Sequence, residues 1–453
     1  MIFRLRDFVF YPRAIKRFHD LLLASQEWPP ERLRGWAQER LERTLVHAST
    51  RVPYYRRTLA PFRGRFAPMV ERLDLSELPY LTKEDVRTHF EELRADNWSE
   101  YRPVPTHTSG STGTPTQFLL DRESNVSHFA FIWRVLNWAG YRFGDRFADL
   151  TGHVSKHGRV AEYDIRLNCL HLSSFDFKRE NIEYYIQRLR RFRPVLLKAY
   201  PSSLDVLCRW VRDAGLELPA PGAVLTCAET LLEHQRQMIQ QTLAAPLYDF
   251  YNQNERAALI STCRHGRYHI HEEYSLVEQV PVGALPQEGG EIVATTYHNM
   301  AMPLIRYRTG DLATPGDNTP CACGRHYRTM GSIQGRIEDV VVTPDGRHVG
   351  RLDAAFKYSP GIRLSRIVQR TPRDIRVDIV KAATYSQRDA NTLERELRAR
   401  LGGSIGIHFN FVEEIPVGSN GKIKFVISEP GRAAVGSYDG QNRITAGIQE
   451  PGN

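Results

Sequence analysis

Pro194-Val-Leu-Leu-Lys-Ala-Tyr200 is a compact, largely apolar run that stands directly before a helical pattern over 202–214. Two runs of the same kind, Ala223–Ala228 and Pro246–Tyr251, enclose a second helical pattern over 231–243. Strands that are buried on both faces of a parallel sheet read as short apolar runs of this kind. Alternation of such strands with helices is typical of α/β proteins. This part of the chain therefore predicts an α/β domain.

The rest of the chain is organised around this region. At 453 residues it is too long for one hydrophobic core. The region before it is mainly helical, with apolar residues near helical spacing at Leu33, Trp36, Leu41 and Leu45. After Gly335, turn signals and alternating strands surround an amphipathic helix over 387–401. We predict a helical segment over 1–74 packed on a large domain over 75–335, a small mobile domain over 336–428 and a disordered tail over 429–453.

Composition and charge narrow the class of protein. The 61 Lys and Arg residues against 52 Asp and Glu give a net charge of +9, which favours anionic ligands. These cations are scattered, and no nucleic-acid-binding motif accompanies them, so we expect no nucleic acid as partner. No apolar run approaches the ~18–20 residues of a membrane span. Six Cys residues without a secretory signal predict reduced thiols and a cytoplasmic location.

The segment Thr108-Ser-Gly-Ser-Thr-Gly-Thr-Pro115 has the composition of a phosphate-binding loop. Its glycines permit close approach of the backbone to a polyanion, and its hydroxyls can donate to phosphate oxygens. No Lys follows the second Gly, so it differs from the P-loop of nucleotide-hydrolysing proteins. A Ser/Gly linker is the alternative interpretation. The strand pattern Gln117–Leu120 that follows indicates instead that the loop belongs to a folded unit.

Five further motifs follow this loop in order: Ala228-Glu229, Tyr251–Glu255, Arg308–Asp311, Gly335–Asp339 and Gly421-Lys422. Together the series resembles the adenylate-forming superfamily of acyl-CoA synthetases, and within it the phenylacetate–CoA ligase and CapK-like branch. The resemblance spans about residues 75–427. It implies a large α/β N-terminal domain joined by a hinge to a small α+β C-terminal domain. It also implies activation of a small carboxylic acid by ATP as an acyl-adenylate, followed by transfer to a thiol such as that of coenzyme A.

The resemblance assigns roles to residues around the nucleotide. Asp311 would accept hydrogen bonds from the ribose hydroxyls, and Tyr251 would lie against adenine, near Ala228 and Glu229. The phosphates would contact Thr108, Ser109, Gly110, Ser111, Thr112, Gly113 and Thr114. Many relatives have Lys at the position of Thr116, whereas the phenylacetate–CoA ligase branch often has Thr.

Other roles concern catalysis and domain motion. Glu255 would hold Mg²⁺, because a hard cation prefers a carboxylate, and Arg336 would contact phosphate or ribose. Glu338 would occupy the hinge between the domains. Lys422 would stabilise the α-phosphate during adenylation, with Lys424 as a rival for that role. Each of these residues also has a plainer interpretation as a turn, linker or surface residue.

The motif Tyr251-Asn-Gln-Asn-Glu255 departs from the pattern Tyr-Gly-x-Thr/Ser-Glu of the superfamily. Asn252 replaces a Gly, and Asn254 replaces a hydroxyl that usually faces the acyl carboxylate. An Asn amide can still donate a hydrogen bond. The departure therefore bears on the choice of acid more than on adenylation itself.

Four soft or borderline ligands stand in two short segments. Cys321-Ala-Cys323 is a tight pair, and Cys263-Arg-His-Gly-Arg-Tyr-His269 lies upstream. Such sets suit tetrahedral Zn²⁺, and the phenylacetate–CoA ligase branch often has similar residues here. We predict a structural zinc site of Cys263, His269, Cys321 and Cys323, with His265 and His271 as alternatives to His269.

Two other functions remain open at this point. The acyl-adenylate could pass to an amine or to a carrier protein instead of coenzyme A. Alternatively, the chain could be a non-catalytic nucleotide-binding protein of polysaccharide biosynthesis. The helices before residue 75 offer a candidate surface for a homodimer.

Overall fold

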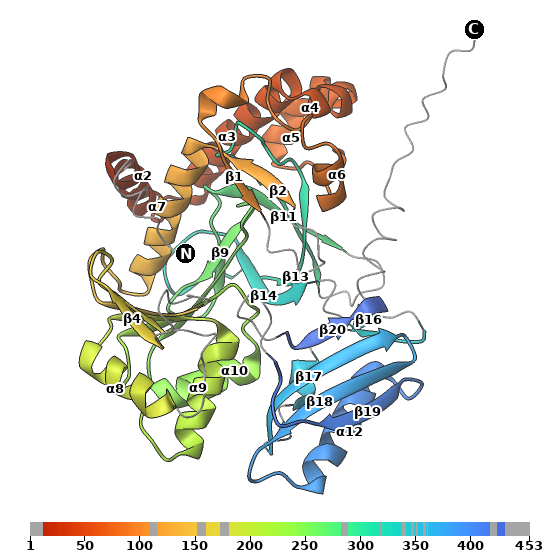
Figure 1. The fold of residues 1–453 in the computed structure, drawn as a ribbon. Coiled ribbons are helices and arrows are strands. Elements are labelled where there is room, and N and C mark those ends of the chain that lie inside the picture. Colours follow the sequence, from red (N-terminus) through yellow and green to blue (C-terminus); the bar gives the residue numbers. More distant parts are fainter. Residues whose placement is uncertain are drawn as a thin grey trace.

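The computed structural model describes residues 12–107, 116–151, 160–172, 181–281, 289–317, 319–336, 341–345, 348–349, 352–356, 359, 361–416 and 424–430. These residues form a large mixed α/β body and a smaller C-terminal α+β part, as the sequence predicted (Figure 1). The exact domain limits stay a prediction, and the predicted tail lies outside the described residues from 431 on. Within the described part, no helix has both the length and the apolar character that a membrane span requires.

Among the described residues, twelve strands of the large body form one sheet in the order β11-β12-β13-β14-β10-β9-β8-β7-β6-β3-β5-β4. Its parallel part pairs β3 with β5 and β6, β6 with β7, and β7 with β8. The bounds of these parallel strands are β3 Phe147–Leu150, β5 Cys169–Leu172, β6 Leu196–Ala199, β7 Ala223–Cys227 and β8 Leu247–Asn252. The three apolar runs that decided the fold class are therefore adjacent strands.

The remaining strands of this sheet pair in antiparallel fashion. Their bounds are β4 Ala161–Asp164, β9 Leu259–Thr262, β10 Tyr268–Ile270, β11 Ser275–Pro281, β12 Gly290–Thr296, β13 Tyr307–Pro315 and β14 Thr329–Arg336. From about residue 260 the chain changes to antiparallel strands, but β11 to β14 are seven to nine residues long, so the short strands that the sequence predicted there are found only in β9 and β10.

Helices cover the parallel strands on both faces. Leu197, Ala199 and Val224 pack with α8 (Ile182–Phe192), α9 (Pro201–Asp213) and α10 (Glu233–Leu243) on one face. Alternate residues of the same strands, such as Leu196 and Leu225, pack on the other face with α7 (Arg122–Trp138) and α2 (Pro12–Ser25). This arrangement follows from the strand period of two, because successive side chains point to opposite faces.

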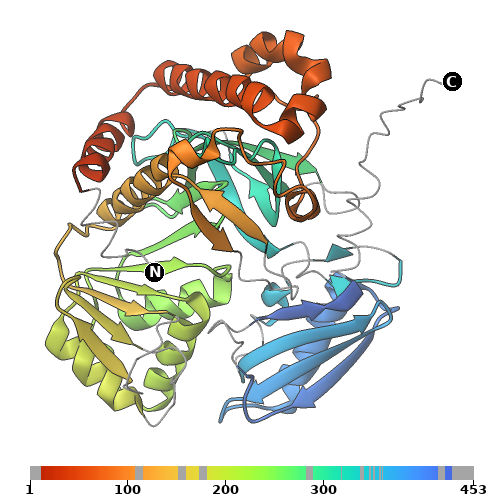
Figure 2. The same ribbon diagram turned by 45° about the horizontal axis from the view of Figure 1, so that its top comes forward.

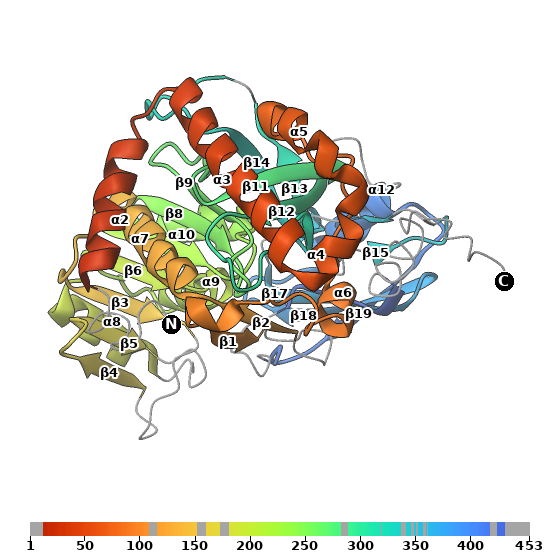
Figure 3. The ribbon, with the colours of Figure 1, turned by 90° about the horizontal axis from the view of Figure 1, so that it is seen from above.

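The N-terminal helices lie over the antiparallel part of the sheet (Figure 3). Leu41 and Leu45 of α3 (Pro30–Arg51) are fully buried, and Thr44 Oγ1 donates to the carbonyl of Thr296 in β12 at 3.3 Å. Helix α6 (Lys83–Thr88) begins at a capping box of Thr82 and Asp85. The other elements here are α4 Pro53–Thr58, η1 Ala60–Arg65, α5 Phe66–Arg72, η2 Trp98–Tyr101, β1 Val104–His107 and β2 Gln117–Leu120.

The C-terminal part has its own hydrophobic core and stands beside the large body in Figures 1 and 2. Leu393, Leu397 and Leu401 of α12 pack on the sheet β19-β18-β17-β20. A cavity of about 410 Å³ between α10 and this part is lined by Met238, Phe356 and Phe425, among others. The elements are β15 Val341–Val342, β16 His348–Val349, α11 Asp353–Phe356, β17 Ile362–Thr371, β18 Asp374–Lys381, α12 Gln387–Leu401, β19 Gly406–Phe411 and β20 Val426–Ser428.

Candidate active site and candidate metal centre

Tyr251, predicted to lie against adenine, and Asp311, predicted to bind the ribose, are direct neighbours. The Tyr251 hydroxyl donates to Asp311 Oδ2 at 2.7 Å. Burial and the adjacent Asp311 raise the pKa of Tyr251, so the phenol keeps its proton and acts as donor. Because β14, β10 and β9 lie between β13 and β8 in the sheet order, this contact requires the sheet to curl.

Strand pairing adds a third predicted position to this pair. In the antiparallel ladder of β13 and β14, Arg336 is the register partner of Asp311. Gly335 beside it has φ of +94°, and a Cβ there would lie 2.8 Å from Thr230 Oγ1. Only glycine suits this close approach. The segment Ala228–Thr230 after β7 is thereby held against the end of β14, next to Asp311.

Glu229, predicted to bind the cofactor, uses its carboxylate within the protein. Its two oxygens accept from the Ser202 amide and the Ser202 hydroxyl in the first turn of α9, both at 3.0 Å. A carboxylate at a helix N-terminus stabilises that helix. Ala228 before it adopts a left-handed φ of +65°, which turns the chain sharply at the strand end. The backbone of this turn therefore faces the site, whereas the Glu229 carboxylate faces α9.

Glu255 lies on the segment between β8 and β9 and is buried against the start of β13. Its Oε1 accepts from the Tyr307 hydroxyl at 3.0 Å, and Tyr307 begins β13 four residues before Asp311. Only 5% of Glu255 is exposed, and among the described residues its Oε2 has no hydrogen-bond partner. One carboxylate oxygen is therefore available to a ligand.

The turn around Asn254 contacts the end of the strand that precedes the predicted phosphate loop in the sequence. Asn254 Nδ2 donates to the carbonyl of His107 at 3.2 Å. His107 is the last residue of β1 and pairs with Gln117 of β2, and the predicted phosphate-binding segment stands between these two residues in the sequence. The segment itself lies outside the described residues. Thr116 follows it and accepts a hydrogen bond from Arg87 Nε at 3.1 Å.

Three further predictions concern residues or side chains that the structure does not describe. Glu338 and Lys422 are outside the described residues, as is the side chain of Arg336. Asn252 is the last residue of β8 and is half-buried. Lys424, the rival of Lys422, is half-buried just before β20. The functional roles of all five residues stay predictions.

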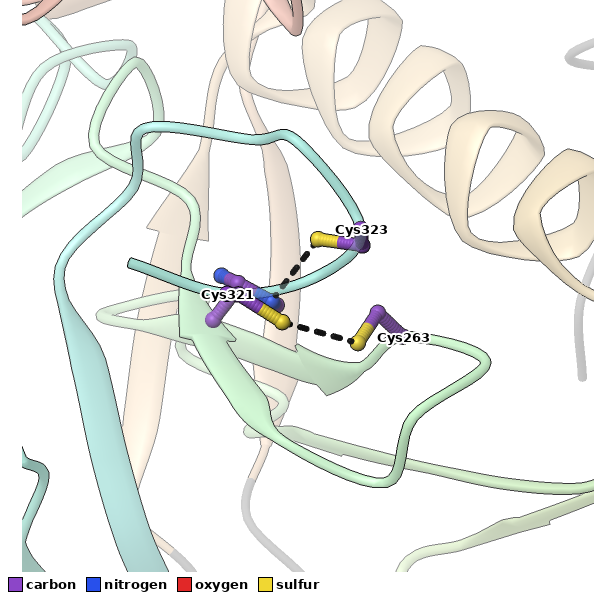
Figure 4. Close-up of side chains that lie close together, drawn as sticks. Cys263, Cys321 and Cys323 are labelled. Carbon is purple, nitrogen blue, oxygen red and sulfur yellow. Dashed lines mark hydrogen bonds between the residues drawn. The ribbon is translucent and has the colours of Figure 1, made fainter. Parts of the chain in front are cut away.

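The four predicted zinc ligands gather in one place. The candidate ligand atoms of Cys263, His269, Cys321 and Cys323 all lie within 4.8 Å of one another. Figure 4 shows Cys263 on the loop between β9 and β10, with Cys321 and Cys323 on the segment before β14. The Cys263 and Cys321 sulfurs are 3.6 Å apart, and Cys323 Sγ lies 3.4 Å from His269 Nε2.

Two local turns and the protonation state of His269 make these four side chains suitable for binding a metal ion. Gly266 and Gly324, each three residues after a cysteine, have φ of +76° and +81°, and each donates its amide back to that cysteine's carbonyl. Burial, with the nearby Arg325, lowers the pKa of His269 to about 4, so the imidazole is neutral and can bind a cation. Three sulfurs and one imidazole nitrogen form a donor set that zinc accepts.

A buried ionic network beside this centre escaped the sequence analysis. Arg134 of α7 donates to Glu273 Oε1 and to the Tyr327 hydroxyl, each at 2.7 Å, and Ser25 of α2 also donates to Glu273 at 2.5 Å. Trp138 stacks on His271 at 5.0 Å between their ring centroids. The network joins the N-terminal helices to the segment before β14. In the sequence, the one signal of this network is Arg134, a charged residue inside the otherwise apolar run Phe129–Leu136.

Comparison with known proteins shows what this chain resembles. Residues 341–429 match the family model of the CapK C-terminal domain. Protein CapK of Staphylococcus aureus is 25% identical over 368 residues, which cover 78% of this chain and 80% of that protein. The phenylacetate-coenzyme A ligase of Thermus thermophilus is 31% identical over 339 residues, which cover 69% of this chain and 72% of the relative.

A solved structure shares the fold. The crystal structure of 2-hydroxyisobutyryl-CoA ligase in the postadenylation state, in complex with R3-HIB-AMP, aligns with a TM-score of 0.67 at 18% identity. The alignment covers 92% of this chain and 94% of that structure.

Proposed function

The chain belongs to the phenylacetate–coenzyme A ligase family, and we propose that it activates a carboxylic acid with ATP and transfers the acyl group to coenzyme A. It is thus an AMP-forming acid–thiol ligase. The observation that most supports its use of a nucleotide is the contact of Tyr251 with Asp311, opposite Arg336 and beside Ala228–Thr230. Four segments far apart in the sequence meet there.

Two displacements make up the proposed reaction. A carboxylate oxygen of the acid attacks the α-phosphorus of ATP, and the bond to the β-phosphate oxygen breaks to release pyrophosphate. The thiolate of the acceptor then attacks the acyl carbon, and AMP leaves with the bonding electron pair. The first step brings together two anions, so a site for it must hold and neutralise phosphate charge.

We propose that residues of the chain meet these needs as follows. Asp311 accepts hydrogen bonds from the ribose diol, since each carboxylate oxygen can take one O–H. Tyr251 lies against the base and keeps Asp311 in position. The backbone and hydroxyls of Thr108–Thr114, next to Asn254, bind the β- and γ-phosphates, and Arg336 adds a cation.

A magnesium ion fits the carboxylate of Glu255. This group is buried, is oriented by Tyr307 and has one oxygen without a partner among the described residues. Hard divalent cations prefer such oxygens. When bound, the ion would neutralise phosphate charge as the pyrophosphate leaves.

We also propose a zinc ion at Cys263, His269, Cys321 and Cys323. The distances between the ligand atoms and the neutral imidazole support this assignment. Four protein ligands complete a tetrahedral site and leave no position for a reactant, so the role is structural. The ion would tie the β9–β10 loop to the segment that leads from β13 into β14.

The test of the function is exchange of labelled pyrophosphate into ATP with a broad panel of acids, followed by AMP release with coenzyme A. We expect exchange with at least one acid and AMP release that depends on coenzyme A. Release that depends on an amine or a carrier protein instead would contradict the proposed acceptor. A folded protein that binds Mg·ATP without exchange for any acid would favour the non-catalytic alternative. A cytoplasmic location and a homodimer stay predictions.

The substitution Lys422→Ala is expected to slow adenylation much more than thioester formation. Loss of a cation that contacts phosphate only during adenylation should slow that step roughly 100-fold. Thioester formation from supplied acyl-adenylate and coenzyme A should change less than about 3-fold. The matched control is Lys424→Ala, two residues along. If K424A alone loses adenylation, the catalytic role passes to Lys424.

A further inference from the structure

Two charged side chains are buried near the carboxyl ends of the parallel strands, and the reaction as described so far does not use them. Lys198 of β6 and Asp149 of β3 are register partners in adjacent strands. Lys198 Nζ lies 3.2 Å from Asp149 Oδ2, and the side chains are only 5% and 8% exposed. Removing two charges from water is costly, so a buried pair of this kind is weak evidence for stability and calls for another explanation.

The Lys198 ammonium is only partly satisfied by the described residues. It has three N–H donors, and among the described residues Asp149 is its one hydrogen-bond acceptor. Burial by itself lowers the pKa of Lys198, but Asp149 outweighs it and raises the pKa, so the group is charged. Asp149 accepts one further bond, from Thr151 Oγ1 at 2.7 Å. A carboxylate has about four acceptor sites, so it has room for another donor.

The position of the pair points to the acid rather than to the nucleotide. Lys198 lies on the same face of the sheet as Leu196, which packs against α7. Cys227 and Tyr200, which lie at or just past the ends of β7 and β6, are close enough to raise the pKa of Lys198. Ligands of parallel α/β sheets bind at the carboxyl ends of the strands. Ala228 and Tyr251 stand at the same ends of β7 and β8, and Lys198 and Asp149 lie on the next two strands, β6 and β3.

We propose that Lys198 and Asp149 form the floor of the acid pocket and select acids that carry a hydroxyl group on the acyl chain; this inference rests on the proposed function. A hydroxyl can accept from a Lys198 N–H and donate to Asp149 at the same time. A hydroxyl group carries no charge, and the Lys198–Asp149 pair carries no net charge. A second carboxylate would add a buried charge without a counterion, and a purely apolar chain would leave the donors unpaired.

Matched pairs of acids test the selection by pyrophosphate exchange. Suitable pairs are phenylacetate with 4-hydroxyphenylacetate, benzoate with 4-hydroxybenzoate, and hexanoate with 6-hydroxyhexanoate, with glutarate as the dicarboxylate. We expect the wild type to prefer the hydroxylated member of at least one pair by about 10- to 100-fold in kcat/KM. The variant D149L/K198M should lose that preference while its turnover of the apolar member stays within about 3-fold.

Two further variants distinguish a loss of the preference for hydroxylated acids from a loss of folding. D205L/R209M removes an ion pair of similar burial from α9, on the other face of the sheet, and should keep the preference. D149N/K198Q keeps polar side chains of similar size and should reduce the preference at least about fivefold, which preserves the test if D149L/K198M does not fold. The KM for ATP should stay constant throughout.

Three results would overturn the inference. These are a wild type that prefers apolar acids, a wild type that prefers glutarate, and a hydroxyl preference that D149L/K198M retains. Each of them requires exchange activity, so each leaves the proposed function intact. Absence of exchange with every acid in the panel and in the broad library would instead overturn the proposed function, and the inference with it.

Discussion

The substitution Asp311→Ala is expected to lower kcat/KM for acyl-adenylate formation roughly 1,000-fold. Each hydrogen bond to a charged group contributes about 1.5–3 kcal/mol, and the proposed role gives this carboxylate two of them from the ribose. The loss should appear mainly as a higher KM for ATP, because the ribose is held before and during the reaction. Pyrophosphate exchange at varied ATP concentration measures it.

Two companion variants make this result specific. Tyr251→Phe removes the phenol that holds Asp311 and should cost about 10-fold in the same assay. Asp213→Ala removes an exposed carboxylate at the end of α9 and should leave the rate unchanged. A folded D311A protein with normal KM for ATP and normal turnover would refute the nucleotide site as proposed.

Removal of the metal centre is expected to have the largest effect on stability. In the variant C263S/C321S, two of four ligands are lost, and the protein should contain no zinc. A structural zinc site contributes several kcal/mol or more to folding, so the melting midpoint should fall by at least about 10 °C. Metal analysis of the purified protein and thermal denaturation followed by circular dichroism check both parts.

The control for this prediction is a cysteine outside the cluster. Cys208 is buried on α9, and C208A should keep one zinc per chain and lose only a small part of the stability. A chelator should lower the midpoint of the wild type to that of C263S/C321S. If the wild type, expressed with zinc, binds none, the four side chains form no zinc site.

Features with a local cause could be predicted from the sequence. The apolar run 223–228 became β7, and the amphipathic pattern 387–401 became α12. The four candidate metal ligands were predicted from two short segments, and the structure brings their side chains together. Such signals lie within a few residues of each other.

Features that depend on long-range geometry could not be predicted. The contact of Tyr251 with Asp311 follows from the curl of the sheet, which no local pattern encodes. The partner of Arg134 is 139 residues away. Glu229 was predicted to bind the cofactor, but the sequence does not show that the N-terminus of α9 lies within reach of its carboxylate.

The separate core of the C-terminal part has an evolutionary consequence. Leu393, Leu397 and Leu401 are buried against strands of their own sheet, and the chain enters this part after β14. A unit that closes its own interior can be exchanged by recombination without repacking the remainder. Chimeras that join residues 1–335 of this chain to the corresponding unit of a relative should fold, and they would inherit their acid preference from the larger parent.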